Sequence, residues 1–166
     1  PKHVQSYRLI GYENRKLRPE DFKNDAIDAG ELGSGHTVTA LYEIIPTGVE
    51  SAFNQDIADL KYSEIKIAPK DYSDELATIK FRYKKPDGEK SIEMIETIKN
   101  NVLLLDKTSD DFKFSAAVAW FGLKLRDSKL VTNKTSKDIK ALALQGKSKD
   151  EDGYRSEFIR LVEAVN

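Results

Sequence analysis

The sequence contains no cysteine and only two histidines, His3 and His36, among its 166 residues. Without cysteine, disulfide bonds, thiolate metal sites and cysteine nucleophiles are all excluded. Neither Gly-x-Ser-x-Gly nor His-Glu-x-x-His occurs, the motifs of many hydrolases and zinc proteases. We therefore expect a protein that is not an enzyme. The alternative is a hydrolase centred on His36, which would need a deep pocket that gathers this histidine with two carboxylates.

Long apolar runs and an excess of one charge are also missing. No apolar run approaches the roughly 18 residues that cross a bilayer, and the N-terminus lacks the apolar centre of a signal peptide. The 27 basic and 28 acidic residues leave a net charge of −1. This balance gives no electrostatic reason to expect nucleic-acid binding. Because the chain begins with Pro1 and not with methionine, we expect a piece of a longer protein.

The residues that are present suit a globular fold. Hydrophobic residues make up 39% and charged residues 33%, which predicts one domain over residues 1–166. In the β-rich part, residues 1–106, the clearest signal is strict alternation from Leu76 onward: Ala77, Ile79 and Phe81 point one way and the intervening polar side chains the other. The turn sequence KPDGEK then predicts a hairpin whose second strand covers 91–98. Further strands are predicted at 4–13, 36–46 and 62–68.

The period of the pattern changes to that of helices in residues 107–166. Thr108 with Asp111 forms a capping box, and so does Thr135 with Asp138. Each precedes apolar residues at three- and four-residue spacing, and Gly146 ends the second helix. The acidic residues 150–152 precede a third helix. Strands followed by about three helices predict an α+β domain, with an antiparallel sheet or sandwich before the helices.

The glycine-rich segment Gly30–His36, GELGSGH, invites a phosphate-loop interpretation that its spacing does not support. A histidine follows the last glycine where a Walker loop needs lysine, and a strand is predicted to follow where a nucleotide-binding loop needs a helix. The glycines are better explained by turns with positive φ.

A calcium site is the other interpretation of this region. Five oxygen-bearing side chains lie within eleven residues, and calcium prefers such ligands; they are Asp21, Asn24, Asp25, Asp28 and Glu31. The EF-hand spacing fails, because Ile27 and Ala29 occupy ligand positions when Gly30 is placed at the turn. Turns and helix caps explain the same residues without metal. We expect no metal site here, with a calcium-dependent binding module as the alternative.

Several segments carry a resemblance that covers nearly the whole chain. They are YRLIGYENRKLRPEDFKNDAIDAGELGSGHTVTALYE, ELATIKFRYKKPDG, DFKFSAAVAWFGLKLRDS and DGYRSEFIRLVEAV. In this order they resemble the C-terminal region of bacterial proteins that carry a von Willebrand factor type A domain, the YfbK-like group.

The resemblance implies a non-catalytic companion of an upstream A domain. The A domain of such proteins binds a divalent cation through an Asp-x-Ser-x-Ser motif. No such motif occurs here, so we expect the cation in the upstream domain and no cofactor in this chain. The implied partners are the upstream A domain, the N-terminal segment of the same chain and an unidentified protein ligand. The implied role is adhesion or complex assembly at the bacterial cell envelope, in a periplasmic protein or an outer-membrane lipoprotein.

Overall fold

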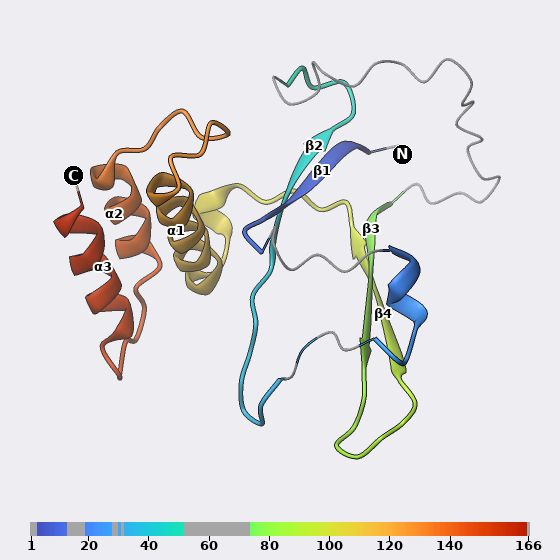
Figure 1. Ribbon diagram of the computed structural model, residues 1–166. Coiled ribbons are helices and arrows are strands. Elements are labelled where there is room, and N and C mark those ends of the chain that lie inside the picture. Colours follow the sequence, from blue (N-terminus) through green and yellow to red (C-terminus); the bar gives the residue numbers. More distant parts are fainter. Residues whose placement is uncertain (1–2, 13–18, 28–29, 31, 52–73, 166) are drawn as a thin grey trace. The chain divides into compact units, whose positions relative to one another are not determined.

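The computed structural model describes residues 3–12, 19–27, 30, 32–51 and 74–165 (Figure 1). Two small antiparallel sheets are followed by three helices, which confirms the predicted α+β class. Contacts divide the chain into two compact units, each described by itself below. Unit 1 comprises 1–8, 12–38 and 43–101, and unit 2 comprises 9–11, 39–42 and 102–166.

The predicted hairpin is formed by β3 (Glu75–Tyr83) and β4 (Ile92–Lys99). The strands pair antiparallel, with Phe81 opposite Met94 and Arg82 opposite Glu93. The Gly88 amide donates to the Lys85 carbonyl at 2.9 Å and closes the turn. Because residues opposite each other share a face, the alternation read from the sequence separates an apolar face from a polar face.

The second sheet pairs β1 (Val4–Ile10) with β2 (Leu41–Pro46). The strand β2 ends at Pro46 as predicted but begins at Leu41, so the prediction of a strand from His36 was five residues too long. A short 3-10 helix, η2 (Pro19–Lys23), was missed by the sequence analysis. The predicted strand at 62–68 lies outside the described residues.

The three helices of unit 2 are α1 (Asp110–Leu125), α2 (Ser136–Gln145) and α3 (Tyr154–Ala164). Thr135 caps α2 as predicted, since its side-chain oxygen accepts the Asp138 amide at 3.4 Å. Its hydroxyl also donates to the Asp138 carboxylate at 2.7 Å. At α1 the predicted cap was wrong: Ser109, one residue later, accepts the Phe112 amide at 3.1 Å. Thr108 instead donates its hydroxyl to the Leu105 carbonyl at the end of the 3-10 turn η4 (Leu105–Lys107).

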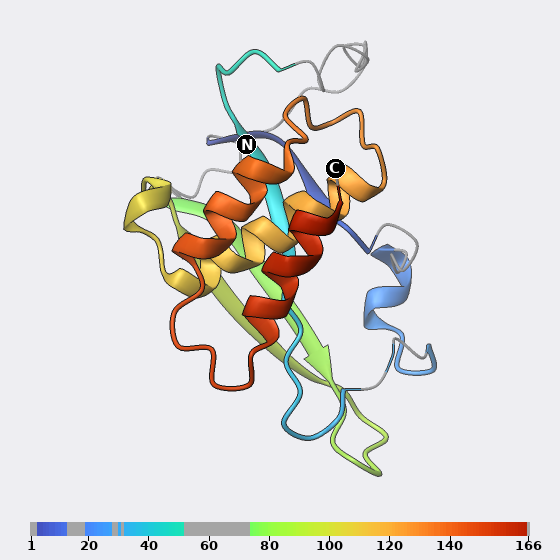
Figure 2. The same cartoon turned by 90° about the vertical axis from the view of Figure 1, so that its left-hand side faces the viewer.

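The three helices pack together in unit 2 (Figure 2), and their apolar side chains form a small core. Ile139 of α2 and Val162 of α3 are fully buried beside Phe121 of α1. The ring of Phe158 meets the rings of Phe114 and Phe121 edge to face, at 5.3 Å and 5.6 Å between centroids. Such pairs stabilise beyond the area they bury. Trp120 packs against the same core, and its Nε1 donates to the Asn133 carbonyl at 2.7 Å.

Gly146 allows α1 and α2 to approach closely. A Cβ at this position would lie 2.5 Å from the Phe114 amide nitrogen and 2.6 Å from the Asp110 carbonyl oxygen, both backbone atoms of α1. The φ of Gly146 is −96°, which any residue can adopt. The requirement for glycine is therefore contact with the neighbouring helix, and not only the helix stop that the sequence indicates.

We predict that Gly146→Ala lowers the free energy of unfolding of the helical unit by about 1–3 kcal/mol, the usual cost of overpacking. The matched control is Gly122→Ala within α1, where an added Cβ meets no atom within 4 Å. That change should stabilise the helix by about 0.5–1 kcal/mol. Urea unfolding followed by the fluorescence of Trp120, the one tryptophan of the chain, measures both. Equal effects of the two substitutions would contradict the close approach.

Candidate functional site

A cluster of polar contacts holds the segment after η2 against the polar face of the β3–β4 hairpin. Arg82 donates from Nη1 to the Phe22 carbonyl at 2.6 Å and from Nη2 to the Asp25 carboxylate at 2.8 Å. Lys84 donates to the Asp25 carbonyl at 2.5 Å, and the Ser91 hydroxyl donates to the Asp25 carboxylate. The Arg82 guanidinium also lies 5.9 Å from the Phe22 ring centroid. We call these contacts the Asp25 clamp.

The Asp25 clamp stabilises the charged form of its carboxylate. The hydrogen bond from Ser91 is the largest cause that lowers the pKa of Asp25, and the charges of Arg82 and Lys84 lower it further. Partial loss of hydration opposes these effects. The clamp thus joins segments that are distant in the sequence, and its acidic group stays ionised at neutral pH.

The residues of the calcium alternative have other uses in the structure where they are described. Asp25 is held by the clamp, and Asn24 accepts the Ala26 amide on its side-chain oxygen at 3.0 Å, which is an Asx turn. The Asp21 carbonyl accepts the Asn24 amide at 3.0 Å. Asp28 and Glu31 lie outside the described residues. Within the ranges that the structure describes, no three His, Asp or Glu side chains are grouped to hold a metal ion.

His36, the centre of the hydrolase alternative, is exposed and belongs to a local turn. Its amide donates to the Gly33 carbonyl at 3.1 Å, and its Nδ1 lies 3.3 Å from the Ser34 carbonyl oxygen. The glycines around it serve the turn, since Gly35 has a φ of +78°. The hydrolase alternative requires a deep pocket around His36, whereas this side chain is exposed.

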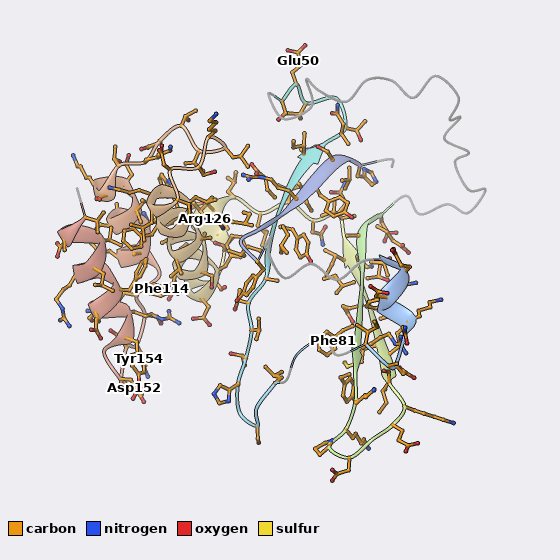
Figure 3. All side chains as sticks on the ribbon, in the orientation of Figure 1. Glu50, Phe81, Phe114, Arg126, Asp152 and Tyr154 are labelled. Atoms are coloured by element: carbon orange, nitrogen blue, oxygen red, sulfur yellow. The ribbon has the colours of Figure 1, made fainter. Side chains whose placement is uncertain are left out.

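Arg155 connects the three helices of unit 2 by polar contacts. It donates to the Gly146 carbonyl at 2.6 Å, pairs with the carboxylate of Asp111, and lies 4.9 Å from the Phe114 ring centroid. Phe114 is labelled on α1 in Figure 3. One side chain of α3 therefore contacts the end of α2 and the first turn of α1.

Asp150 caps the start of α3, where the sequence analysis expected acidic residues. Its carboxylate accepts the Arg155 amide at 3.0 Å and the Ser156 amide at 2.8 Å. The hydroxyl of Ser156 is the largest cause that lowers the pKa of Asp150, and these two amides add to it. The cap thus gives Asp150 a structural role at the start of α3.

A lysine and a serine lie close together in unit 2, a pairing that also occurs in some hydrolases. Lys124 Nζ donates to Ser136 Oγ at 2.5 Å and to the Val165 carbonyl at 3.2 Å. The Ser136 hydroxyl donates to the same carbonyl. A nucleophilic serine needs a base that accepts its proton, whereas here the lysine donates and the hydroxyl proton goes to the backbone. These contacts hold the end of α3, and no sequence motif signals them.

The apolar face of the β3–β4 hairpin is exposed. Its residues are Ala77, Ile79, Phe81, Tyr83, Ile92, Met94 and Ile98, with Glu96 as the one charged member. Phe81, which Figure 3 labels, is 54% exposed, and Met94 opposite it is 56% exposed. The clamp therefore contacts the polar face at Arg82 and Lys84, while within the described residues the apolar face meets solvent. Contiguous exposed apolar side chains are typical of surfaces that bind other proteins.

The chain is thus an α+β protein in which the residues described make structural clamps, caps and an exposed apolar sheet face. Its sequence matches, over residues 1–166, the family described as "Uncharacterized protein YfbK, C-terminal". The chain belongs to this family, which confirms the resemblance read from the sequence.

A relative in this family is the "Uncharacterized protein YfbK" of Escherichia coli (strain K12). It is 41% identical over 167 residues, an alignment that covers 100% of this chain and 28% of the relative. The chain therefore spans little more than a quarter of the curated relative that it matches. No solved structure matches the chain. Among the described residues, no helix has both the length and the apolar character needed to cross a membrane.

The lowered pKa of Asp25 predicts a pH-dependent clamp. Because this pKa is lower in the folded than in the unfolded chain, the carboxylate stabilises the fold above the unfolded pKa of about 3.9. That stability is lost as the pH falls through the lower, folded pKa. We expect the amides of β3 and β4 to exchange faster in Asp25→Asn than in the wild type at pH 6, with the difference shrinking below about pH 4.

The control for the clamp is Asp74→Asn. This change removes an exposed ion pair in which Lys99 Nζ lies 3.7 Å from Asp74 Oδ2. Exposed pairs contribute little, so this variant should exchange like the wild type at both pH values. A difference between Asp25→Asn and wild type that is unchanged on acidification would contradict the role of the carboxylate.

We predict that millimolar calcium leaves the thermal unfolding midpoint unchanged, because Asp25 already pairs with Arg82 and the Asn24 side chain already accepts the Ala26 amide. A ligand that binds only the folded state would raise the midpoint. The measurement is calorimetric unfolding with calcium, with magnesium and with chelator. A rise with calcium that disappears in Asp28→Asn and Glu31→Gln would establish the calcium alternative instead.

Proposed function

We propose that the chain is a non-catalytic accessory domain that acts together with other regions of a YfbK-type protein. The observation that carries this proposal is the extent of the match. The family is matched over the whole chain, yet this length is only 28% of the E. coli relative. A region of this size with its own helical core is suited to pack on, or to orient, the rest of such a protein.

The resemblance supports a finer form of the same proposal. In it, the chain lies C-terminal to a von Willebrand factor type A domain and supports the binding of a protein ligand by that domain, at the bacterial cell envelope. The divalent cation belongs to the A domain in this scheme, and the present chain contributes contacts and no chemistry. The exposed apolar side chains of unit 1 support a role in protein–protein contact.

The proposal predicts that the chain binds the part of the E. coli relative that lies outside the match. That part is purified separately, its folding is checked by circular dichroism, and the mixture is studied by sedimentation velocity. We expect a 1:1 complex with a Kd in the micromolar range or tighter. The matched C-terminal region of the E. coli relative is the positive control, because it is the natural counterpart. Failure of both C-terminal regions to form a complex would contradict the proposed function.

A further inference from the structure

We propose that the apolar face of the β3–β4 hairpin is the surface through which this domain docks onto another part of the same YfbK-type polypeptide. This inference rests on the proposed function and assigns it a surface. The face is formed by four rows of opposed residues: Ala77 with Ile98, Ile79 with Glu96, Phe81 with Met94, and Tyr83 with Ile92. Seven of these eight side chains are apolar, and each of the large ones is more than a third exposed.

A two-stranded hairpin with an uncovered apolar face is a marginal structure in water. Independent stability normally requires a third strand or a packed layer on the hydrophobic face. In this chain the residues Phe22–Asp25 are bound to the opposite, polar face through Arg82 and Lys84. The large side chains of the apolar face stay more than a third exposed, and this is the face that we assign to a partner. Phe81, stacked on Tyr83 with 6.3 Å between the ring centroids, offers the partner an aromatic contact.

The single acid on this face distinguishes between two occupants. Glu96 lies in the second row, opposite Ile79, and would be covered when a partner packs on the face. A buried carboxylate is costly unless a cation or hydrogen-bond donor meets it. A second copy presenting the same face brings no lysine or arginine, because the face contains none. The occupant is therefore a different surface, one that is apolar and carries a basic side chain or donors opposite Glu96.

The length of the E. coli relative supports a binding partner for this face within the same polypeptide. More than two thirds of the E. coli relative lies outside the match, so such a surface is available at the high effective concentration of a covalently linked region. A domain held in this way needs only a small apolar contact to stay docked, and one face of a hairpin is such a contact.

The test uses a full-length chimera in which residues 1–166 replace the matched region of the E. coli relative. Met94, the one methionine of this chain, lies in the centre of the face and is the probe. Its oxidation by hydrogen peroxide depends on exposure and is followed by mass spectrometry of the peptide that contains it. We expect oxidation in the chimera to be about tenfold slower, or more, than in the isolated chain.

Two substitutions on the same strand separate docking at this face from a general effect. Phe81→Asp places a charge on the apolar face, and Thr78→Asp places the same charge on the polar face. Phe81→Asp should return the oxidation rate of Met94 in the chimera to that of the isolated chain, while Thr78→Asp should leave the protection intact. Amide exchange of β3 and β4 in each isolated variant verifies that the hairpin is still formed.

Three outcomes would overturn the inference. Equal oxidation of Met94 in chimera and isolated chain, together with a complex between the separate parts, would mean that docking uses another surface while the proposed function stands. Equal oxidation with no complex would contradict both. Concentration-dependent protection of Met94 in the isolated chain, abolished by Phe81→Asp, would assign the face to a second copy.

Discussion

The burial of Ile139 and Val162 between three short helices is the interaction on which the rest of the described structure depends. All the hydrophobic side chains that the structure describes as buried belong to α1, α2 or α3. Isolated helices of 10 to 16 residues are marginal in water, so these three persist because each covers an apolar stripe of another. Gly146 lets the backbones of α1 and α2 come close together. Arg155 of α3 binds beside this contact, at the Gly146 carbonyl and the Asp111 carboxylate.

The β3–β4 hairpin of unit 1 is held together by a different kind of interaction. No residue of β3 or β4 is buried, so the hairpin is held by its ladder of hydrogen bonds and by the Asp25 clamp. The clamp is stabilised by ion pairs and hydrogen bonds, whereas unit 2 is stabilised by the burial of apolar side chains. The clamp binds the polar face at Arg82 and Lys84, and the apolar face stays exposed, as interface surfaces are. This division of roles agrees with a domain that works inside a larger polypeptide.

The fold class and most element positions could be read from the sequence because they depend on local patterns. Alternation along 76–83 predicted β3, and the Thr135 capping box predicted the start of α2. The cap of α1 was placed one residue early, because Thr108 and Ser109 are both good caps and the choice depends on the 3-10 turn before them. The Arg82–Asp25 pair, the Lys124–Ser136 contact and the crowding at Gly146 join residues that are distant in sequence. No spacing rule signals such pairs, and a structure is needed to find them.

The Asp25 clamp has a consequence for the order in which the chain folds. Its two key residues are 57 positions apart, whereas the contacts between α1 and α2 join neighbouring segments. Closing a longer loop costs more entropy before any contact compensates for it, and chains rich in local contacts fold faster. The helical unit is therefore expected to fold first, and the hairpin to acquire the cover on its polar face afterwards. When the complete chain refolds, this order leaves both faces of the hairpin exposed until the clamp forms on the polar face.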